Sequence, residues 1–325
     1  MKIKVLGNHS VETAKEREWR PGYVFTSNPS CADYDWLVVY DELPRDDRGT
    51  FHDGCEQLRC PKERTILLTW EPVSIKGYSR AYTRQFGHLL TNRPPEAEDH
   101  PHYHLGRGYY HWFNGHAPMD IGDLHPAKTR EISAVCSSKQ MRHSKHHARY
   151  RLVSEMAKAI PGLDWFGKGI RPIEKKYEAM DAYRYHVVIE NHIGVHHWTE
   201  KLADAFLSEC LPFYAGDPAI FEVFPRESII PIPIDNPYEA IRIVREAIAS
   251  GEYEKRREAV QEAKRQILEK YNFWDQVIAV IESASDQPVT PVDPDRPVRI
   301  FARKVLRRRS LAAVLEDAWW HLRHI

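Results

Sequence analysis

Two short polar motifs, Glu190-Asn191 and Thr199-Glu200-Lys201, have residue types and a spacing that could bind a phosphorylated ligand. Thr199 is a preferred residue type for a helix N-cap, and it would place Glu200 and Lys201 in the first turn of the following helix. A lysine is unfavourable there, because the N-terminal end of a helix carries partial positive charge. A bound anion would remove this conflict, since free backbone N–H groups and the Lys201 ammonium would both face it. A phosphate site is therefore one interpretation of the motif.

The local chemistry leaves a second interpretation open, in which Glu200 and Lys201 are a solvated ion pair on a surface helix. The preceding element favours the ligand site. Residues 185–190 (YHVVIE) form an apolar run typical of a buried strand, and this strand ends at Glu190-Asn191. Ligands of open α/β sheets bind at the carboxyl ends of strands, which is where the loop to Thr199 lies.

Strand and helix patterns alternate along the second half of the chain and predict a doubly wound α/β domain. Strands are predicted over 131–137, 163–166, 185–190, 211–215 and 228–232, and helices over 149–160, 173–183, from Thr199, 237–249, 253–271 and 273–283. In the first half, the apolar runs 2–7, 36–40 and 65–70 predict buried strands of a mostly parallel sheet. Residues 93–116 are rich in Pro, His, Gly and Tyr and predict a long irregular loop.

The polar motifs resemble the donor-binding signature of the family 10 fucosyltransferases, usually seen as FEN, then TEK, then a P-x-x-x-G turn. The corresponding residues here are Glu190-Asn191, then, after eight intervening residues, Glu200-Lys201-Leu202, and then Leu211-Pro212 and Gly216-Asp217-Pro218. The similarity extends backwards through Leu163–Gly167 to Arg149, and forwards to Tyr271, Phe273 and Trp274. It covers residues 131–282 well and the N-terminal half only weakly.

This resemblance implies that the chain binds a nucleotide diphospho-sugar as its donor. Arg149 and Lys201 would neutralise the pyrophosphate, with Arg151 as the alternative arginine, and Asn191 and Glu200 would bond ribose or sugar hydroxyls. Glu190 and Thr199 complete the motif. His197 stands where the family usually has tyrosine, so we include it in the donor-binding set and keep open a related transferase with another GDP- or UDP-linked sugar.

The family inverts the configuration at the sugar, which requires a general base for the acceptor hydroxyl. Glu71 follows the run 65–70 and resembles the glutamate that family members carry in the acceptor lobe. The alternative is a loop glutamate without a catalytic role. Residues 85–92 (QFGHLLTN) are also similar to the family and support this register.

The fold implied is GT-B, with two Rossmann-like doubly wound domains facing across a cleft. We expect an acceptor-binding domain over residues 1–130 and a donor-binding domain over 131–285. Residues 286–325 would form a proline-rich linker and a basic amphipathic segment with Trp319 and Trp320. That segment could contact an anionic membrane surface or pack back onto the N-terminal domain.

The resemblance implies that no metal or cofactor is obligatory, because basic side chains would take the place of the ion. Asp33-Tyr34-Asp35 matches a metal-binding pattern of other glycosyltransferases, but its place before residues 36–40 favours a turn and strand start. Cys55 and Cys60 lack a second pair for zinc. Eight clustered histidines match no zinc spacing; they are His100, His102, His104, His111, His116, His143, His146 and His147.

The composition is that of an ordinary globular enzyme, with 46 basic and 46 acidic residues among 325. The zero net charge argues against a nucleic-acid-binding protein. No secretory signal and no membrane span are recognisable, and the five cysteines fit reduced thiols, so we expect a cytoplasmic protein. The expected reaction is transfer of fucose from GDP-fucose to a glycan hydroxyl, for example on lipopolysaccharide. A relative that binds glycan or nucleotide without catalysis is the alternative.

Overall fold

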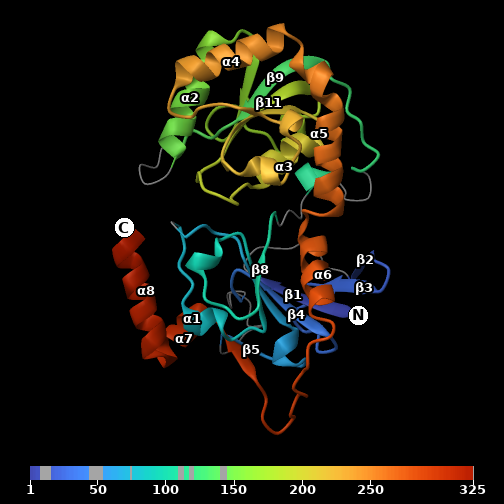
Figure 1. Cartoon of the computed structure of the whole chain (residues 1–325), viewed down its shortest axis with the longest axis vertical. Coiled ribbons are helices and arrows are strands. Elements are labelled where there is room, and N and C mark those ends of the chain that lie inside the picture. Colours follow the sequence, from blue (N-terminus) through green and yellow to red (C-terminus); the bar gives the residue numbers. More distant parts are fainter. Residues whose placement is uncertain are drawn as a thin grey trace. The chain divides into compact units, whose positions relative to one another are not determined.

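The computed structural model describes residues 1–7, 16–43, 54–73, 75–108, 113–116, 121–139 and 145–324, with the backbone alone at 317 and 321–324. The chain forms two compact units (Figure 1). Unit 1 comprises Met1–His111 and Phe273–Ile325, and unit 2 comprises Trp112–Asn272. The division expected from the sequence, at 130/131 and 285/286, differs from this one at both boundaries.

Unit 1 is built on a seven-stranded sheet with the strand order β2-β3-β1-β4-β6-β7-β8, in which only β2 runs antiparallel to its neighbour. The strands are β1 (Lys2–Gly7), β2 (Arg17–Arg20), β3 (Tyr23–Thr26), β4 (Trp36–Tyr40), β6 (Thr65–Thr69), β7 (His88–Thr91) and β8 (Tyr103–Leu105). The predicted strands at 2–7, 36–40 and 65–70 are confirmed, because each apolar run is β1, β4 or β6 at the centre of the sheet, buried on both faces.

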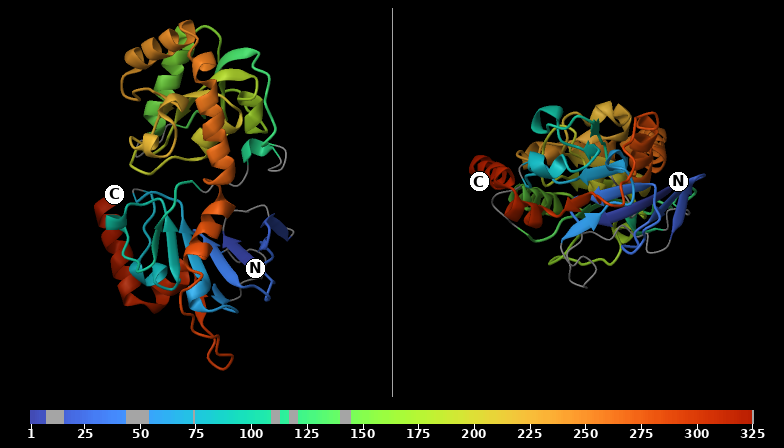
Figure 2. Two further views of the ribbon diagram at one scale, coloured as in Figure 1. Left: turned by 45° about the vertical axis from the view of Figure 1, so that its right-hand side comes forward. Right: turned by 90° about the horizontal axis from the view of Figure 1, so that it is seen from below.

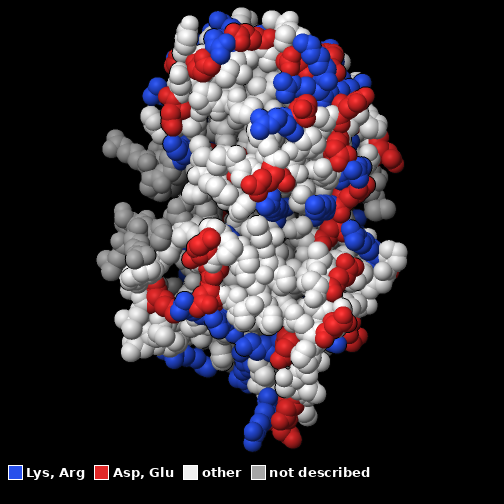
Figure 3. Space-filling model, in the orientation of Figure 1, with Lys and Arg blue, Asp and Glu red and all other residues white. Residues whose placement is uncertain are grey.

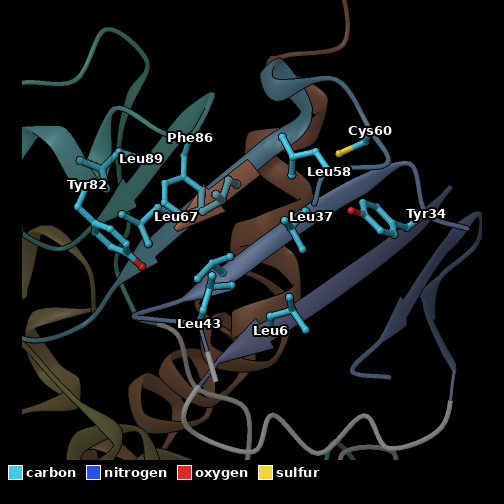
Figure 4. Close-up of a cluster of buried hydrophobic side chains, with 12 residues drawn as sticks. Leu6, Tyr34, Leu37, Leu43, Leu58, Cys60, Leu67, Tyr82, Phe86 and Leu89 are labelled. Carbon is cyan, nitrogen blue, oxygen red and sulfur yellow. The ribbon is translucent and has the colours of Figure 1, made fainter. Parts of the chain in front are cut away.

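One hydrophobic cluster of unit 1 packs on the sheet face shown in Figure 4. Leu6, Leu37 and Leu67 project from adjacent strands, and Tyr82 and Phe86 cover them from the segment that includes helix α1 (Arg80–Thr83). All five side chains are at most 2% exposed. Burial of this apolar surface from water is the main force that fixes these elements against the sheet.

Helix α6 (Phe273–Ser283) belongs to unit 1, which explains the displaced second boundary. Phe273 packs against Phe25 and Tyr40, with ring centroids 6.5 and 6.0 Å away, and Trp274 stacks on Trp19 at 4.3 Å. These aromatic contacts with the N-terminal sheet have no signature in the local sequence.

Unit 2 contains a five-stranded parallel sheet with the order β10-β9-β11-β12-β13. Its strands are β9 (Arg130–Val135), β10 (Leu163–Phe166), β11 (Tyr183–Ile189), β12 (Leu211–Ala215) and β13 (Ile230–Pro231), and its helices are α2 (His146–Ala159), α3 (Glu200–Leu207), α4 (Pro237–Ala249) and α5 (Glu252–Glu269). The predicted alternation of strands and helices is thus confirmed. On the face shown in Figure 3, acidic and basic side chains lie beside one another over α5, as in the ion pairs of Arg265 with Glu262 and Glu269.

The helix predicted over residues 173–183 is wrong. Only a short 3-10 helix, η4 (Lys176–Ala179), forms there. The Glu178 carboxylate accepts a hydrogen bond from the backbone N–H of Lys175 at 2.7 Å, which closes a single turn. Tyr183 is already the first residue of β11 and is buried, so the chain enters the strand soon after this turn.

The C-terminal segment packs onto unit 1, which is one of the two alternatives open from the sequence. Residues 284–298 contain no helix or strand, in agreement with the predicted linker. Strand β14 (Arg299–Phe301) then pairs antiparallel with β5 (Cys55–Gln57). Helices α7 (Arg303–Arg309) and α8 (Leu311–His324) follow, and α8 lies beside α1 (Figures 1 and 2). Within the described residues, no helix has the length and apolarity needed to cross a bilayer.

Candidate functional site

The motifs singled out in the sequence meet at the end of β11. Glu190 follows this strand and is completely buried. Its carboxylate accepts hydrogen bonds from the backbone N–H of Thr199 at 2.9 Å and from the Thr199 hydroxyl at 2.7 Å. Thr199 is also the N-cap of α3, since its hydroxyl oxygen accepts from the backbone N–H of Lys201. Glu190 therefore fixes the start of the helix relative to the strand.

Lys201 lies in the first turn of α3, within reach of three oxygen atoms. Its Nζ is 3.0 Å from Thr199 Oγ1, 3.1 Å from Glu200 Oε1 and 3.4 Å from Glu190 Oε2. Burial opposes the charged form of the ammonium, but Glu200 and Glu190 outweigh it and raise the pKa of Lys201. Lys201 is therefore a cation over the whole physiological pH range.

A second lysine, Lys176 on η4, joins this group and was not identified from the sequence. Its Nζ lies 2.5 Å from Asp204 Oδ2 and 3.7 Å from Glu200 Oε1. Although burial acts in the opposite direction, Lys201 and Lys176 lower the pKa of Glu200 well below its usual value. No sequence signal pointed to Lys176 or Asp204, because they lie 28 residues apart and only the fold brings them together.

Arg149, on α2, is buried beside Asn191 and donates a hydrogen bond from Nη1 to the Asn191 side-chain oxygen. Its Nε is buried as well and has no hydrogen-bond partner among the described residues. A buried donor without a partner carries a free-energy cost that a ligand acceptor would remove. The alternative arginine, Arg151, is exposed on the same helix.

These side chains surround a cavity of about 210 Å³ in unit 2. Its lining includes four basic and two acidic residues, namely Arg149, Lys168, Lys176, Lys201, Glu200 and Asp204. The remaining walls come from the sheet, from the loops at the ends of β9 and β10, and from the residue after η4; they are Val135, Ser137, Gly167, Met180, His186, Val187, Val188 and Ile189. The surplus of cations gives the cavity the electrostatic character of an anion site.

Six of the predicted donor-binding residues thus fall into two groups. Arg149, Glu200 and Lys201 line the cavity, and Asn191 bonds to Arg149. Glu190 and Thr199 bond to each other and fix the start of α3.

His197 is apart from both of these groups. It is 7% exposed, packs against His192 with ring centroids 5.1 Å apart, and does not line the cavity. Burial, with smaller contributions from His192 and Lys201, lowers the pKa of His197 to about 3, so its ring is neutral at pH 7.

The glycine of the P-x-x-x-G turn is required by close packing at the end of β12. A Cβ atom on Gly216 would lie 2.1 Å from Tyr214 Oη and 2.8 Å from Glu190 Cγ. Any larger residue would displace the carboxylate that holds Thr199. Glycine is therefore the residue type that fits between Tyr214 and Glu190 at position 216.

Glu71 lies in unit 1, two residues after the end of β6. Its backbone carbonyl accepts hydrogen bonds from Arg93 Nε at 2.9 Å and Arg93 Nη2 at 2.8 Å. Arg93 is in turn paired with Glu98 at 2.9 Å, in a position where both side chains are at most 5% exposed. A buried ion pair therefore positions the backbone at Glu71.

The described residues of the motifs considered for metal binding take part in hydrogen bonds and core packing. Asp35 accepts a hydrogen bond from the Lys2 backbone N–H at 2.7 Å ahead of β4, and Tyr34 is a core residue, in agreement with the predicted turn and strand start. Cys60 is buried and directs its thiol to the Arg64 carbonyl. His111 and His143 lie outside the described residues. Among the described His, Cys, Asp and Glu side chains, no group of three could hold a metal ion.

No protein-family model matches the chain, and no curated protein matches it in sequence. Similar solved structures were found. An α1,3-fucosyltransferase is 15% identical with a TM-score of 0.51, over 88% of this chain and 90% of that one. The α1,3-fucosyltransferase structure with GDP-fucose gives the same identity and TM-score, over 90% of this chain and 92% of that one. Anabaena Alr3699/HepE in complex with UDP-glucose is 11% identical with a TM-score of 0.52, over 88% and 99%. At such low identities the likeness concerns the fold, and it shows that this chain has the GT-B fold with two Rossmann-like domains.

Proposed function

We propose that the chain is an inverting glycosyltransferase that transfers fucose from GDP-fucose to a hydroxyl group of a glycan. The observation that carries this proposal is the cavity of unit 2, where Arg149, Lys176 and Lys201 converge at the ends of parallel strands. Ligands of doubly wound sheets bind in this position. The solved α1,3-fucosyltransferase with GDP-fucose supports the choice of donor.

In this proposal the basic side chains bind the pyrophosphate of the donor. Arg149 Nε, which is buried and unpartnered among the described residues, would donate to a phosphate oxygen, as would the Lys201 ammonium. The diphosphate gains negative charge as the bond to the sugar breaks, so the cations stabilise the transition state more than the bound donor. Glu200, held ionised by Lys201 and Lys176, would accept hydrogen bonds from ribose or sugar hydroxyls.

Glu71 is proposed as the general base. It would remove the proton of the acceptor hydroxyl while that oxygen attacks the anomeric carbon and GDP leaves from the opposite side. The buried pair of Arg93 and Glu98 would keep the Glu71 backbone in place. The reaction written in this way needs no divalent metal and no cofactor, because the protein's own cations balance the charge of the leaving group.

A UDP-linked sugar is the competing donor, supported by the structure of Anabaena Alr3699/HepE with UDP-glucose. The sequence departure at His197 motivated this alternative, but His197 does not line the cavity. Calorimetric titration with GDP, GDP-fucose, GDP-mannose and UDP-glucose separates the donors. Selective binding of GDP-fucose, weakened in Lys201→Ala and retained in the exposed control Lys158→Ala, supports the proposal. Binding of UDP-glucose alone contradicts the donor, and binding of no nucleotide contradicts the transferase. NMR of the product, compared with the donor, tests inversion.

Two further expectations from the sequence belong with this proposal. The acceptor would be a surface glycan such as lipopolysaccharide, and the protein would work in the cytoplasm. Peripheral membrane contact through the basic C-terminal segment stays a prediction.

A further inference from the structure

A large groove lies in unit 1 between α8 and the loop that follows Glu71. Its volume is about 700 Å³, and its walls include Tyr78, Arg80, Asp99, Glu316, Trp319 and Trp320. We propose that this groove binds a pyranose ring of the glycan acceptor, with Trp319 as its stacking surface. The inference deepens the proposed function and rests on it for the identity of the ligand as an acceptor.

The groove is preformed because Trp320 anchors α8 to the loop. The Trp320 indole N–H donates to the Val73 carbonyl at 3.0 Å. The same ring lies close to Gly77, where a Cβ atom would be only 2.6 Å from Trp320 Cγ. A hydrogen bond and a close packing contact thus hold the helix in one position. A preformed site loses less entropy on binding than one that must first become ordered.

Trp319, the next residue on α8, is 54% exposed and lines the groove. An indole presents a large apolar face together with a polar N–H edge. One face of a pyranose ring carries mainly C–H groups, so it packs on such a surface while the hydroxyl groups at its edges stay hydrogen-bonded. The groove volume lies within the roughly 300–1,000 Å³ usual for small-molecule sites.

The groove also contains polar groups suited to sugar hydroxyls. Glu316 Oε2 is buried and has no hydrogen-bond partner among the described residues. An unsatisfied buried acceptor is costly, and a hydroxyl donor would relieve that cost. Arg80 and Asp99 form an ion pair at 2.6 Å, with side chains 65% and 47% exposed, so they present further donors and acceptors at the opening.

The charge of the groove disfavours a lipid headgroup as its occupant. Four carboxylates line it, from Glu96, Glu98, Asp99 and Glu316, against the guanidinium groups of Arg80 and Arg93. Anionic membrane lipids are recognised by clusters of basic residues, which is the opposite balance. Neutral sugars with several hydroxyl groups need acceptors of the kind that predominate here.

The groove shares its walls with the segment proposed to carry the general base. Val73 lies two residues after Glu71, and Arg93 both lines the groove and donates to the Glu71 carbonyl. A sugar bound to Trp319 would therefore contact the loop that holds Glu71. This connection makes an acceptor, rather than an unrelated saccharide, the fitting ligand.

The test uses the full-length protein without any donor. A glycan array of neutral and acidic mono- to tetrasaccharides identifies a ligand, and calorimetry measures its Kd for the wild type, Trp319→Ala, Trp319→Phe and Glu316→Gln. Leu315→Ala is the matched control, since Leu315 is 60% exposed on α8 but does not line the groove. We expect about a tenfold higher Kd for Trp319→Ala, with recovery in Trp319→Phe and no change in Leu315→Ala. Thermal unfolding shows whether each variant is folded.

The inference is overturned if no glycan binds to the wild type, or if Trp319→Ala and Glu316→Gln bind the glycan as the wild type does. It is also overturned if Trp319→Ala loses binding to phosphatidylglycerol vesicles but keeps its glycan affinity. If the wild type hydrolyses the donor and the variants bind the glycan as the wild type does, the acceptor groove is contradicted and the proposed transferase is not. Glycan binding that depends on Trp319, without any nucleotide-sugar binding, would uphold the groove and contradict the transferase.

Discussion

The ammonium of Lys201 lies 3.4 Å from the carboxylate of the fully buried Glu190, which connects the first turn of α3 to the end of β11. The same lysine lines the cavity of unit 2. Lys201 therefore both pairs with a buried carboxylate and lines the cavity.

Lys201→Ala should weaken GDP binding by about tenfold to a hundredfold, because a charge-assisted hydrogen bond to phosphate is lost. It should also lower the free energy of unfolding by about 3 kcal/mol, since Glu190 is left buried without its counter-charge. Calorimetry and urea denaturation measure the two effects. Lys201→Arg should restore much of the binding, and equal GDP affinity in Lys201→Ala would contradict the assignment.

Thr199→Ala should lower the free energy of unfolding by about 1–2 kcal/mol, because it removes the cap of α3 and a hydrogen bond to Glu190. Thr199→Ser keeps the hydroxyl group and should stay close to the wild type. Urea denaturation of both variants compares them directly. Equal loss of stability in the two would show that the methyl group, not the hydroxyl, matters at this position.

Glu71→Gln should abolish most transfer to the acceptor, because the amide cannot take up the proton of the acceptor hydroxyl. GDP binding should stay unchanged, since Glu71 belongs to unit 1 and the cavity proposed to bind the donor belongs to unit 2. Initial rates of fucose transfer and calorimetry with GDP measure the two properties. Glu16→Gln, at an exposed position of unit 1, is the control. Wild-type turnover in Glu71→Gln would rule out its role as the base.

Gly77→Ala should destabilise unit 1 by about 1–3 kcal/mol, because the added methyl group would overlap the Trp320 ring. Gly122→Ala is the matched control, since no atom lies within 4 Å of a Cβ at that position. Thermal unfolding should show a lower Tm for the first variant only. Equal Tm values would contradict the packing of α8 on this loop.

The stability of the protein should fall as the pH decreases from about 6.5, partly because of two buried histidines in unit 2. Burial, and next Lys176 and Lys128, lower the pKa of His186 to about 3, and burial lowers that of His197 to about 3. The unfolded chain binds protons at these sites near its ordinary pKa of about 6.5, whereas the folded protein does not, so acid favours unfolding between these two values.

Each histidine can contribute up to about 1.4 kcal/mol per pH unit in this range. Replacement of His186 by glutamine should therefore reduce the slope of unfolding free energy against pH between 6 and 4. His147→Gln, at an exposed position, is the control. Urea denaturation over this pH range measures the slopes, and identical slopes for His186→Gln and the wild type would contradict the explanation.

Local residue patterns predicted the two elements that position Glu190, Glu200 and Lys201, namely β11 and α3. The apolar run 185–190 predicts β11, and the capping residue Thr199 predicts the start of α3, because both depend on neighbours in the chain. The lysine in the first turn after Thr199 raised the possibility of an anion site, and the spacing of Glu190, Glu200 and Lys201 carried the family resemblance. These features need only the periodicity of strands and the capping chemistry of helices.

The tertiary structure alone decided which distant residues meet. Lys176 joins Glu200 and Asp204 only because η4 and α3 pack together. Helix α6 belongs to unit 1 because Trp274 stacks on Trp19 and Phe273 packs edge-on against Tyr40. The groove beside Trp319 depends on α8 returning to the loop after β6 across more than 200 residues, since Trp320 and Val73 are 247 positions apart. Packing between such segments depends on the complementary shapes of buried side chains, a property that no local sequence pattern contains.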